Sequence, residues 1–259
     1  NGVDQNRKIY FVSDFHFGIP DRKRSAVREK KLIRWLDFVR KDAEEIFLMG
    51  DLFDFWFEYH TVIPKGYARL LGKLAEITDS GIPVHFFKGN HDMWAFNYLQ
   101  DEIGMILHRE PVIRDFGSKR FFLSHGDGLG PGDHGYKLIK YIFERRINRF
   151  LFNWLHPDLG TRLGLFWSRR SRYANETPEA KSKEEERLKD IDNSRLAIYC
   201  RKKLQEDPTI NYFIFGHWHI SNMHPIGKDS YYIHIGDWLK LFTYGIFDGD
   251  RFGLKKFED

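Results

Sequence analysis

The sequence predicts an α/β fold, and three observations support this class. Apolar runs at 9–12, 46–49 and 84–88 have the length and residue types of buried strands. Segments with helical periodicity separate these runs, so the elements alternate in the order β-α-β-α-β. The chain of 259 residues is long enough for one large α/β domain, or for one domain with an inserted subdomain. We therefore expect the first three strands to form a parallel or mostly parallel sheet.

Two amphipathic helices account for the segments between these strands. Residues 25–41 place Leu32, Leu36 and Val39 at helical spacing. Residues 67–78 have the same period, and a turn at 80–83 leads into the third strand.

The later part of the chain contains further strand signals. Six runs predict strands, of which the first two and the last two form hairpins: 112–116, 121–123, 212–215, 231–235, 242–248 and 251–257. Both ends of the chain are therefore expected to be rich in β-structure.

The segment from 136 to about 206 has no strand pattern and is predicted to be helical. Its periodicity is interrupted at four positions, which we interpret as helix breaks: Pro157, Gly160, Gly164 and Pro178. We expect this segment to be an insertion that divides the chain into a core, 1–134 and 207–259, and an inserted helical cap, 135–206.

The cap has a distinctive composition. Between residues 137 and 172 it has nine lysine or arginine residues and two acidic residues, interleaved with many large apolar side chains. This mixture fits an amphipathic surface that meets anionic lipid headgroups or an acyl chain. Helices that pack on the sheet with a solvated basic face would explain the same pattern.

Charge and cysteine content narrow the cellular setting. The net charge of +4 is modest and does not by itself indicate a nucleic-acid partner. Cys200 is the only cysteine, so no intramolecular disulfide can form, which suits a reducing compartment. The N-terminal residues lack an apolar signal sequence, and no stretch approaches about 18 consecutive apolar residues. We expect a cytoplasmic protein that does not span a membrane.

Residue types that bind metal ions directly follow five predicted strands. They are Asp14 and His16, Asp51 and Asp54, Asn90, His91 and Asp92, His125 and Asp127, and His217 and His219. Because ligands gather beyond the carboxyl ends of strands in α/β sheets, these loops are expected to converge. Mixed carboxylate, imidazole and amide ligands suit Mn²⁺, Fe²⁺ or Zn²⁺, and Asp51 can bridge two ions about 3.5–4 Å apart. Sharp backbone turns are expected at four neighbouring glycines: Gly50, Gly89, Gly126 and Gly216.

The chain resembles the calcineurin-like metallophosphoesterase superfamily in five motifs: Asp14-x-His16, Gly50-Asp51-x-x-Asp54, Gly89-Asn90-His91-Asp92, His125 and Gly216-His217-x-His219. The resemblance implies two packed β-sheets flanked by helices, and hydrolysis of a phosphate ester or anhydride. It also implies two metal ions that share Asp51, with Asp14, His16 and His219 completing one site and Asn90, His125 and His217 completing the other. His91 would stabilise charge on the phosphoryl group or protonate the leaving oxygen, with Asp54 or Asp92 holding its ring.

Within that superfamily, the stretches 50–57, 78–90 and 125–137 and the helical insertion are similar to the UDP-2,3-diacylglucosamine diphosphatases of lipid A biosynthesis. This resemblance implies cleavage of a lipid-linked nucleotide to UMP and diacylglucosamine 1-phosphate, usually with Mn²⁺, at the cytoplasmic face of the inner membrane. It implies that the cap covers the acyl chains. Substrate contacts are expected from Asn90, His91, Asp133, Tyr136, Arg169 and Arg172.

One residue departs from the closer family, which commonly has arginine where this chain has His91. Arginine offers a permanent bidentate charge and histidine a titrating one, so hydrolysis of another nucleotide or lipid phosphate stays an alternative. A nuclease or nucleic-acid-binding protein is a third hypothesis. The bulky aliphatic residues between the basic residues of the cap argue against it, because single strands bind to exposed aromatic platforms in polar grooves. We therefore expect no nucleic-acid partner.

Overall fold

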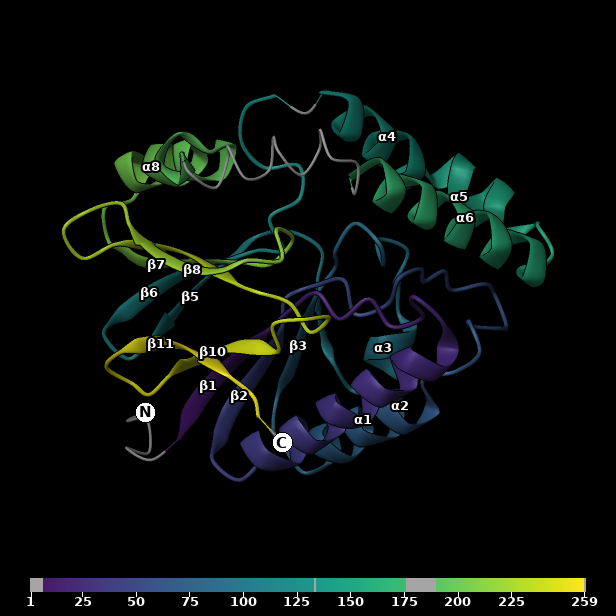
Figure 1. Ribbon diagram of the computed structural model, residues 1–259, viewed down its shortest axis with the longest axis horizontal. Helices are drawn as coiled ribbons and strands as arrows, with labels where there is room; N and C mark the ends of the chain where they lie inside the picture. Colours follow the sequence, from purple (N-terminus) through teal and green to yellow (C-terminus); the bar gives the residue numbers. More distant parts are fainter. Residues whose placement is uncertain (1–6, 133, 176–189, 259) are drawn as a thin grey trace.

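Two β-sheets stacked face to face form the centre of the structure, a computed structural model that describes residues 7–132, 134–175 and 190–258 (Figure 1). The first sheet has the strand order β11-β10-β1-β2-β3-β4, with β1 at Lys8–Val12, β2 at Ala43–Leu48, β3 at Val84–Phe87, β4 at Ile106–His108, β10 at Thr243–Phe247 and β11 at Phe252–Lys256. Strands β1 to β4 run parallel, while β10 and β11 form an antiparallel edge. The prediction that the first three strands are parallel is confirmed.

The second sheet has the strand order β5-β6-β7-β9-β8, with β5 at Val112–Phe116, β6 at Lys119–Leu123, β7 at Ile210–Phe215, β8 at Ser221–Pro225 and β9 at Tyr231–Ile235. Its three central strands are parallel, and β5 and β8 pair antiparallel at the edges. Both predicted hairpins, β5-β6 and β10-β11, are therefore confirmed.

An apolar core rich in aromatic rings lies between the two sheets. Phe11 and Phe47 from the first sheet and Phe121 and Ile214 from the second are fully buried in this core. The Phe11 ring stacks on Phe47 at a centroid distance of 5.1 Å and on Phe121 at 6.0 Å. These stacked rings hold the two sheets, and therefore the loops at their ends, in a fixed relation.

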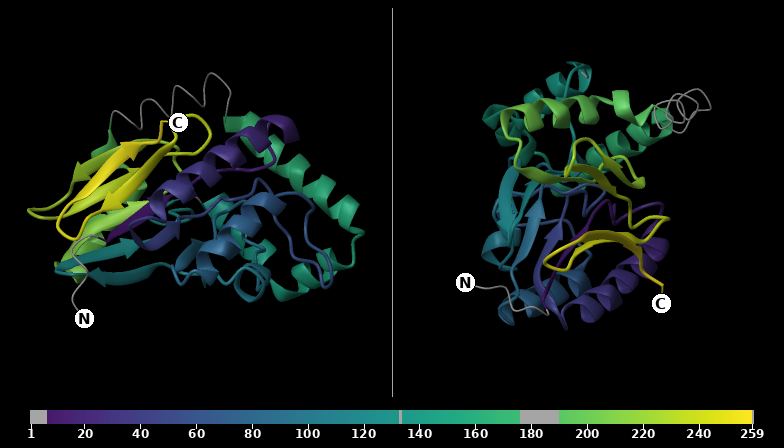
Figure 2. Two further views of the ribbon diagram at one scale, coloured as in Figure 1. Left: turned by 90° about the horizontal axis from the view of Figure 1, so that it is seen from below. Right: turned by 90° about the vertical axis from the view of Figure 1, so that its left-hand side faces the viewer.

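Helices cover the outer faces of both sheets (Figures 1 and 2). Helices α1 at Arg22–Val39 and α2 at Ala68–Asp79 pack on the first sheet, and α3 at Tyr98–Asp101 precedes β4. On the second sheet, α8 at Arg195–Glu206 buries Leu196, Ala197 and Cys200, after a short helical turn, η1, at Ile191–Asn193. The predicted architecture of two packed sheets flanked by helices is confirmed.

Two strands were not predicted, and both are short edge strands. β4 has three residues, too few for a period to emerge. β8 has the sequence SNMHP, which lacks β-branched and aromatic residues and ends in proline. β4 becomes a strand by pairing with β3, and β8 by pairing with β9, rather than through a strand pattern in the local sequence.

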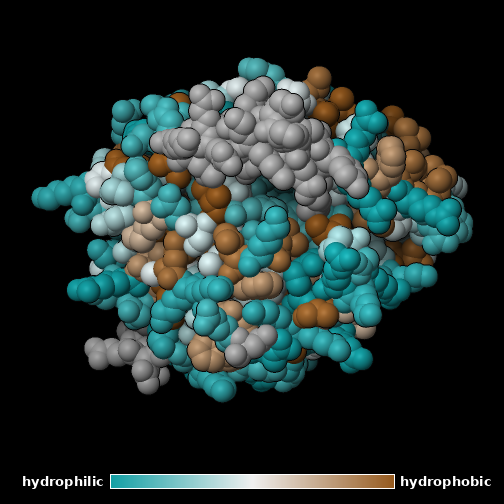
Figure 3. Space-filling model, in the orientation of Figure 1, coloured by the Kyte–Doolittle hydropathy of each residue, from teal (hydrophilic) through white to brown (hydrophobic). Residues whose placement is uncertain are grey.

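Three helices form a separate layer beside α8 (Figure 1): α4 at His134–Glu144, α5 at Arg146–Asn153 and α6 at Pro157–Asn175. One of their contacts with the core is aromatic, since Trp94 lies 5.4 Å from Phe143 and 5.1 Å from Phe152 between ring centroids. The Trp94 indole Nε1 also donates a hydrogen bond to the Phe143 carbonyl at 3.0 Å. Most other large apolar side chains of this layer are exposed, and Figure 3 shows them gathered over α4 to α6. Within the described ranges, no helix combines the length and apolarity needed to span a membrane.

The predicted helix breaks at Gly160 and Gly164 are wrong, because α6 runs through both positions. Pro157 begins that helix, and Pro178 lies outside the described residues. The two glycines serve close approach: a Cβ at Gly164 would lie 2.1 Å from the Phe55 ring, and one at Gly160 would lie within van der Waals overlap of the Tyr59 hydroxyl. The missing side chains let α6 lie directly against the segment that follows β2.

The division into a core and a cap at 135–206 stays a prediction. Its last helix, α8, belongs by packing to the second sheet, whereas α4 and α5 bury no residue completely.

Substituting Gly164 tests the close contact of α6 with the core. We expect Gly164→Ala to lower the free energy of unfolding by about 1–3 kcal/mol, because the new methyl group overlaps the buried Phe55 ring. Gly135→Ala in α4 is the control, since a Cβ there meets nothing within 4 Å; it should be neutral or stabilising by up to about 1 kcal/mol. Urea unfolding measures both, and equal stability of the two variants would contradict the contact.

Candidate metal centre

The loops that follow β1, β2, β3, β6 and β7 meet where the two sheets adjoin. Backbone hydrogen bonds join the first two loops, because Asp14 N donates to Gly50 O at 3.1 Å and His16 N to Asp51 O at 2.9 Å. Across the sheets, His217 N donates to Asp14 Oδ2 at 2.8 Å. The loops after β3 and β6 join at Asp51, since His91 N donates to Asp51 Oδ1 at 2.9 Å and His125 Nε2 lies 3.4 Å from Asp51 Oδ2. The five loops therefore form one connected cluster, and the predicted convergence is confirmed.

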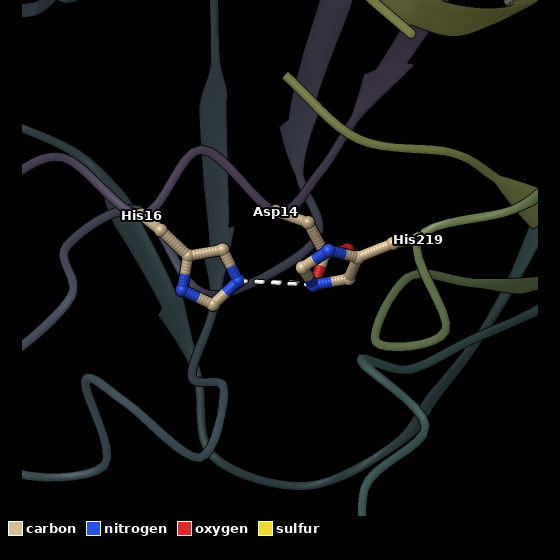
Figure 4. A group of neighbouring side chains, drawn as sticks. All are labelled: Asp14, His16 and His219. Carbon is tan, nitrogen blue, oxygen red and sulfur yellow. Dashed lines mark hydrogen bonds and ion pairs between the residues drawn. The ribbon is translucent and has the colours of Figure 1, made fainter. Parts of the chain in front are cut away.

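The first group of ligand atoms contains Asp14, His16 and His219 (Figure 4). The Nε2 atoms of the two histidines lie 3.1 Å apart. Asp14 Oδ1 lies 3.2 Å from Nε2 of His219 and 3.7 Å from Nε2 of His16. Three side chains therefore place potential metal-ligand atoms around one small volume.

The second group contains Asp51, His125 and His217. His125 Nε2 lies 3.4 Å from Asn90 Oδ1, which brings the predicted amide ligand to the same place. Asp51 Oδ2 lies 3.4 Å from His125 Nε2 and 3.6 Å from His16 Nε2. A single carboxylate oxygen is therefore placed between the two groups, as a bridging ligand requires.

These donors fit divalent cations. Two ligand atoms at right angles around an ion, each about 2.1 Å from it, lie about 3 Å apart, close to the separation of the His16 and His219 nitrogens. Among the described residues, the buried Asp14 Oδ1 has no hydrogen-bond partner. An unsatisfied buried carboxylate oxygen is costly unless a cation lies beside it.

Backbone strain is concentrated in these loops. Seven described residues other than glycine have positive φ, and five of them carry ligand atoms: Asp14, His16, Asp51, His217 and His219. The left-handed conformation disfavours side chains with a Cβ, so it persists where the surroundings enforce it, often at functional sites. The ligand side chains are therefore aimed by an unfavourable backbone that the sheets hold in place.

The four glycines beside the ligands have two different functions. Gly50 and Gly126 have φ of 104° and 110°, which confirms the expected turns. Gly89 and Gly216 are absent from the positive-φ positions and leave room for ligands, and a hydrogen bond from Trp218 N to Gly216 O at 2.8 Å closes a tight turn at His217. A Cβ at Gly89 would lie 2.2 Å from Asp51 Oδ1, and one at Gly216 would lie on the Ser13 hydroxyl.

Comparison with known proteins identifies the family. The family model of the calcineurin-like phosphoesterases matches residues 7–221. The chain belongs to the calcineurin-like phosphoesterase family. A protein named UDP-2,3-diacylglucosamine hydrolase from Porphyromonas gingivalis is 34% identical over 97% of this chain and 98% of its own length. A protein of the same name from Histophilus somni is 26% identical over 90% of this chain and 92% of its own length.

A solved structure of a dimetal phosphatase from Danio rerio matches this phosphoesterase with a TM-score of 0.47 at 12% identity, over 97% of this chain and 96% of that one. Family membership makes the chain a metal-dependent hydrolase, and the two ligand groups fit its divalent ions.

Burial and charge set the protonation of the ligands. Burial lowers the pKa of the His16 imidazole to about 3 and the pKa of His217 to about 4. Burial also acts to lower the pKa of His125, but the adjacent Asp51 carboxylate outweighs it and raises that pKa to about 10. Burial acts to raise the pKa of Asp51, but the nearby imidazoles, His125 first, lower it below its usual range. His16 and His217 are therefore neutral at pH 7, the form that binds metal, and Asp51 is ionised.

His91 lies beside the ligand groups of this phosphoesterase, with its ring 4.7 Å from that of His16. Its Nδ1 is 2.9 Å from the Asp54 carbonyl oxygen and 3.7 Å from the Asp54 carboxylate. Asp92 has a different set of partners: its carboxylate accepts from the backbone of Gly89 and of Leu52, each at 2.7 Å. Of the two candidates for holding the His91 ring, Asp54 contacts it, whereas Asp92 joins the loops after β2 and β3.

Sequence reasoning missed one polar residue at this site, Ser168 of α6. Its hydroxyl donates to Asp54 Oδ2 at 2.9 Å and lies 3.3 Å from His91 Nδ1. The available signal was the spacing Gly160-x-x-x-Gly164-x-x-x-Ser168, which puts three small residues on one helix face. Reading the glycines as helix breaks concealed it.

The predicted substrate contacts are only partly described. The Tyr136 hydroxyl donates to Asp127 at 2.5 Å, and Lys140 donates to the same carboxylate at 2.8 Å. Arg169 is exposed on α6. Asp133 and the side chain of Arg172 lie outside the described residues.

A methyl group at Gly89 should disturb the bridging carboxylate. We expect Gly89→Ala to weaken divalent-ion binding at least tenfold, because its Cβ would overlap both the Asp51 carboxylate and backbone nitrogen. Gly72→Ala in α2 is the control, since a Cβ there meets nothing within 4 Å. The measurement is the metal content of both variants after dialysis against Mn²⁺, determined by inductively coupled plasma mass spectrometry. Equal metal content in both variants would show that Asp51 does not need this space.

Proposed function

We propose that this phosphoesterase hydrolyses the pyrophosphate bond of UDP-2,3-diacylglucosamine, giving UMP and 2,3-diacylglucosamine 1-phosphate. The observation that carries the proposal is the placing of Asp51 Oδ2 between two groups of metal ligands beside a basic, apolar helical layer. The two groups of metal ligands account for the hydrolytic chemistry, and the layer of α4 to α6 accounts for a lipid-linked substrate. Relatives that carry this activity in their names match nearly the whole chain.

The residues that we propose as metal ligands divide between two ions with Asp51 shared: Asp14, His16 and His219 for one, and Asn90, His125 and His217 for the other. Two bound divalent ions would supply an activated water and positive charge beside the phosphoryl oxygens. The mixture of imidazole, carboxylate and amide suits Mn²⁺, Fe²⁺ or Zn²⁺. Of these we propose Mn²⁺, the ion that the resemblance to the UDP-2,3-diacylglucosamine diphosphatases implies.

His91 is proposed as the group that meets the phosphoryl oxygens. A carbonyl oxygen can only accept a hydrogen bond, so the 2.9 Å contact with Asp54 O assigns a proton to His91 Nδ1. This leaves Nε2 to stabilise charge or to protonate the leaving oxygen. Asp54 is proposed to hold the ring, and Asp92 to support the loop.

Helices α4 to α6 are proposed as the cap over the acyl chains and as the contact with the inner-membrane surface. Eighteen large apolar side chains of the described residues are exposed, and twelve of them lie between Leu138 and Trp167. Basic residues interleave with them, which suits anionic headgroups. We propose substrate contacts from Asn90, His91, Asp133, Tyr136, Arg169 and Arg172.

Release of UMP tests the proposed activity. With Mn²⁺ and detergent-solubilised UDP-2,3-diacylglucosamine, we expect UMP release that chelation with EDTA abolishes. Asp51→Asn should lower the rate at least a thousandfold, because it removes the shared carboxylate charge, whereas Asp250→Asn in the exposed β10-β11 turn should not. Chromatography of the nucleotide product measures all three. Hydrolysis of soluble nucleotides without UMP release from the lipid would replace this substrate with another nucleotide or phosphate ester.

Sedimentation with lipid vesicles tests the membrane contact. We expect the protein to bind vesicles that contain phosphatidylglycerol, less tightly at high salt, and Trp154→Glu to weaken binding at least fivefold. Trp154 is 76% exposed at the end of α5, so a carboxylate there opposes both apolar burial and anionic lipid. Val27→Glu on α1 is the control, because Val27 is 65% exposed outside the cap. Equal loss in both variants would contradict a membrane contact specific to the cap.

A further inference from the structure

Ser168 is unusual among the residues of the cap helices. The burial of α4 to α6 is described for residues 134–170. Within this range, Ser168 is the only buried residue other than glycine. Its exposed fraction is 6%, in a layer where leucine, phenylalanine and tryptophan side chains are exposed. A polar side chain is thus buried in preference to many apolar ones, so packing alone does not explain its position.

The partners of Ser168 belong to the candidate active site. Its hydroxyl donates to Asp54 Oδ2 at 2.9 Å, and that aspartate is 1% exposed. A hydroxyl has one proton, so the 3.3 Å contact with His91 uses Ser168 Oγ as acceptor and the His91 Nδ1 proton as donor. Asp54 O and Ser168 Oγ therefore both require the proton on Nδ1.

The path of α6 brings Ser168 to this point. Gly160, Gly164 and Ser168 follow one another at intervals of four residues and share a face of the helix. The two glycines lie against Tyr59 and Phe55, so α6 approaches the segment after β2 closely along this line. One turn beyond Gly164, the same close approach puts the Ser168 hydroxyl on Asp54.

We propose that Ser168 is a positioning residue, which couples the docking of α6 on the core to the orientation of His91 through Asp54. The inference rests on the proposed function, because it needs His91 to face the phosphoryl group. With α6 docked, the serine fixes the Asp54 carboxylate and gives the Nδ1 proton a second acceptor. His91 Nε2 is then held toward the reacting phosphate. When α6 leaves the core, this support leaves with it, so the site is complete only under a closed cap.

Two measurements test the role of Ser168. The first uses a substrate too small to need the cap, bis-p-nitrophenyl phosphate with Mn²⁺. We expect Ser168→Ala to lower kcat about fivefold to tenfold, the loss expected for one typical hydrogen bond, with KM and metal content unchanged. In a His91→Ala background, Ser168→Ala should have no further effect, because the serine acts through that ring.

The second measurement does not depend on activity. In the metal-free protein, nitrogen-15 NMR of the imidazole rings, with His91 assigned by its loss in His91→Ala, should show the proton on Nδ1. In Ser168→Ala, we expect those signals to shift toward the averaged positions of a ring whose proton exchanges between Nδ1 and Nε2.

Thr161→Ala is the matched control, since it removes a hydroxyl from the same helix about 10 Å from Ser168. It should leave kcat and the His91 signals unchanged. The proposal is overturned by a His91 proton on Nε2, by equal losses of kcat with and without His91, or by no loss in Ser168→Ala. None of these outcomes depends on UMP release, so failure here and failure of the proposed lipid substrate are separate results.

Discussion

The position of the Asp51 carboxylate is the constraint on which the rest of the site depends. Its Oδ2 lies within 3.6 Å of a histidine from each ligand group, and its Oδ1 accepts the backbone N–H of His91 at 2.9 Å. Its carbonyl oxygen binds the loop after β1. One residue at the end of β2 therefore orders the loops after β1 and β3 and faces the loop after β6. Its left-handed backbone is tolerated because neighbouring glycines leave space and both sheets hold the loops.

Much of this organisation can be predicted from the sequence because its signals are local. Strand and helix periods predicted the parallel strands and both hairpins. Metal-ligand residue types at strand ends predicted the loops of the candidate metal centre. What escaped prediction depends on contacts across the fold. Gly164 looks like a helix breaker until Phe55 is known to lie against it. Ser168 looks like any helical serine until Asp54 is found beside it, and β8 becomes a strand only through its pairing with β9.

The cap helices differ physically from the core. The two sheets are held by an interior of buried rings, whereas α4 and α5 bury no residue completely. They are attached by the aromatic contacts of Trp94, by the hydrogen bonds of Tyr136 and Lys140 to Asp127, and by the close approach of α6. A layer with little interior of its own opens at a lower free-energy cost than the sheets do. Large exposed apolar surface of this kind is typical of a region that meets a partner or a ligand.

The first ligand group joins residues that are far apart in the chain, since His16 and His219 are 203 positions apart. One comes from the end of the first sheet's β1 and the other from the end of the second sheet's β7. During synthesis, a chain that has emerged only as far as β6 therefore has no complete set of donors for this group. Ion capture at this group must follow long-range closure, which is slow relative to helix formation. Because the ion would bind only the finished arrangement, metal supply would raise the stability of the mature fold by mass action.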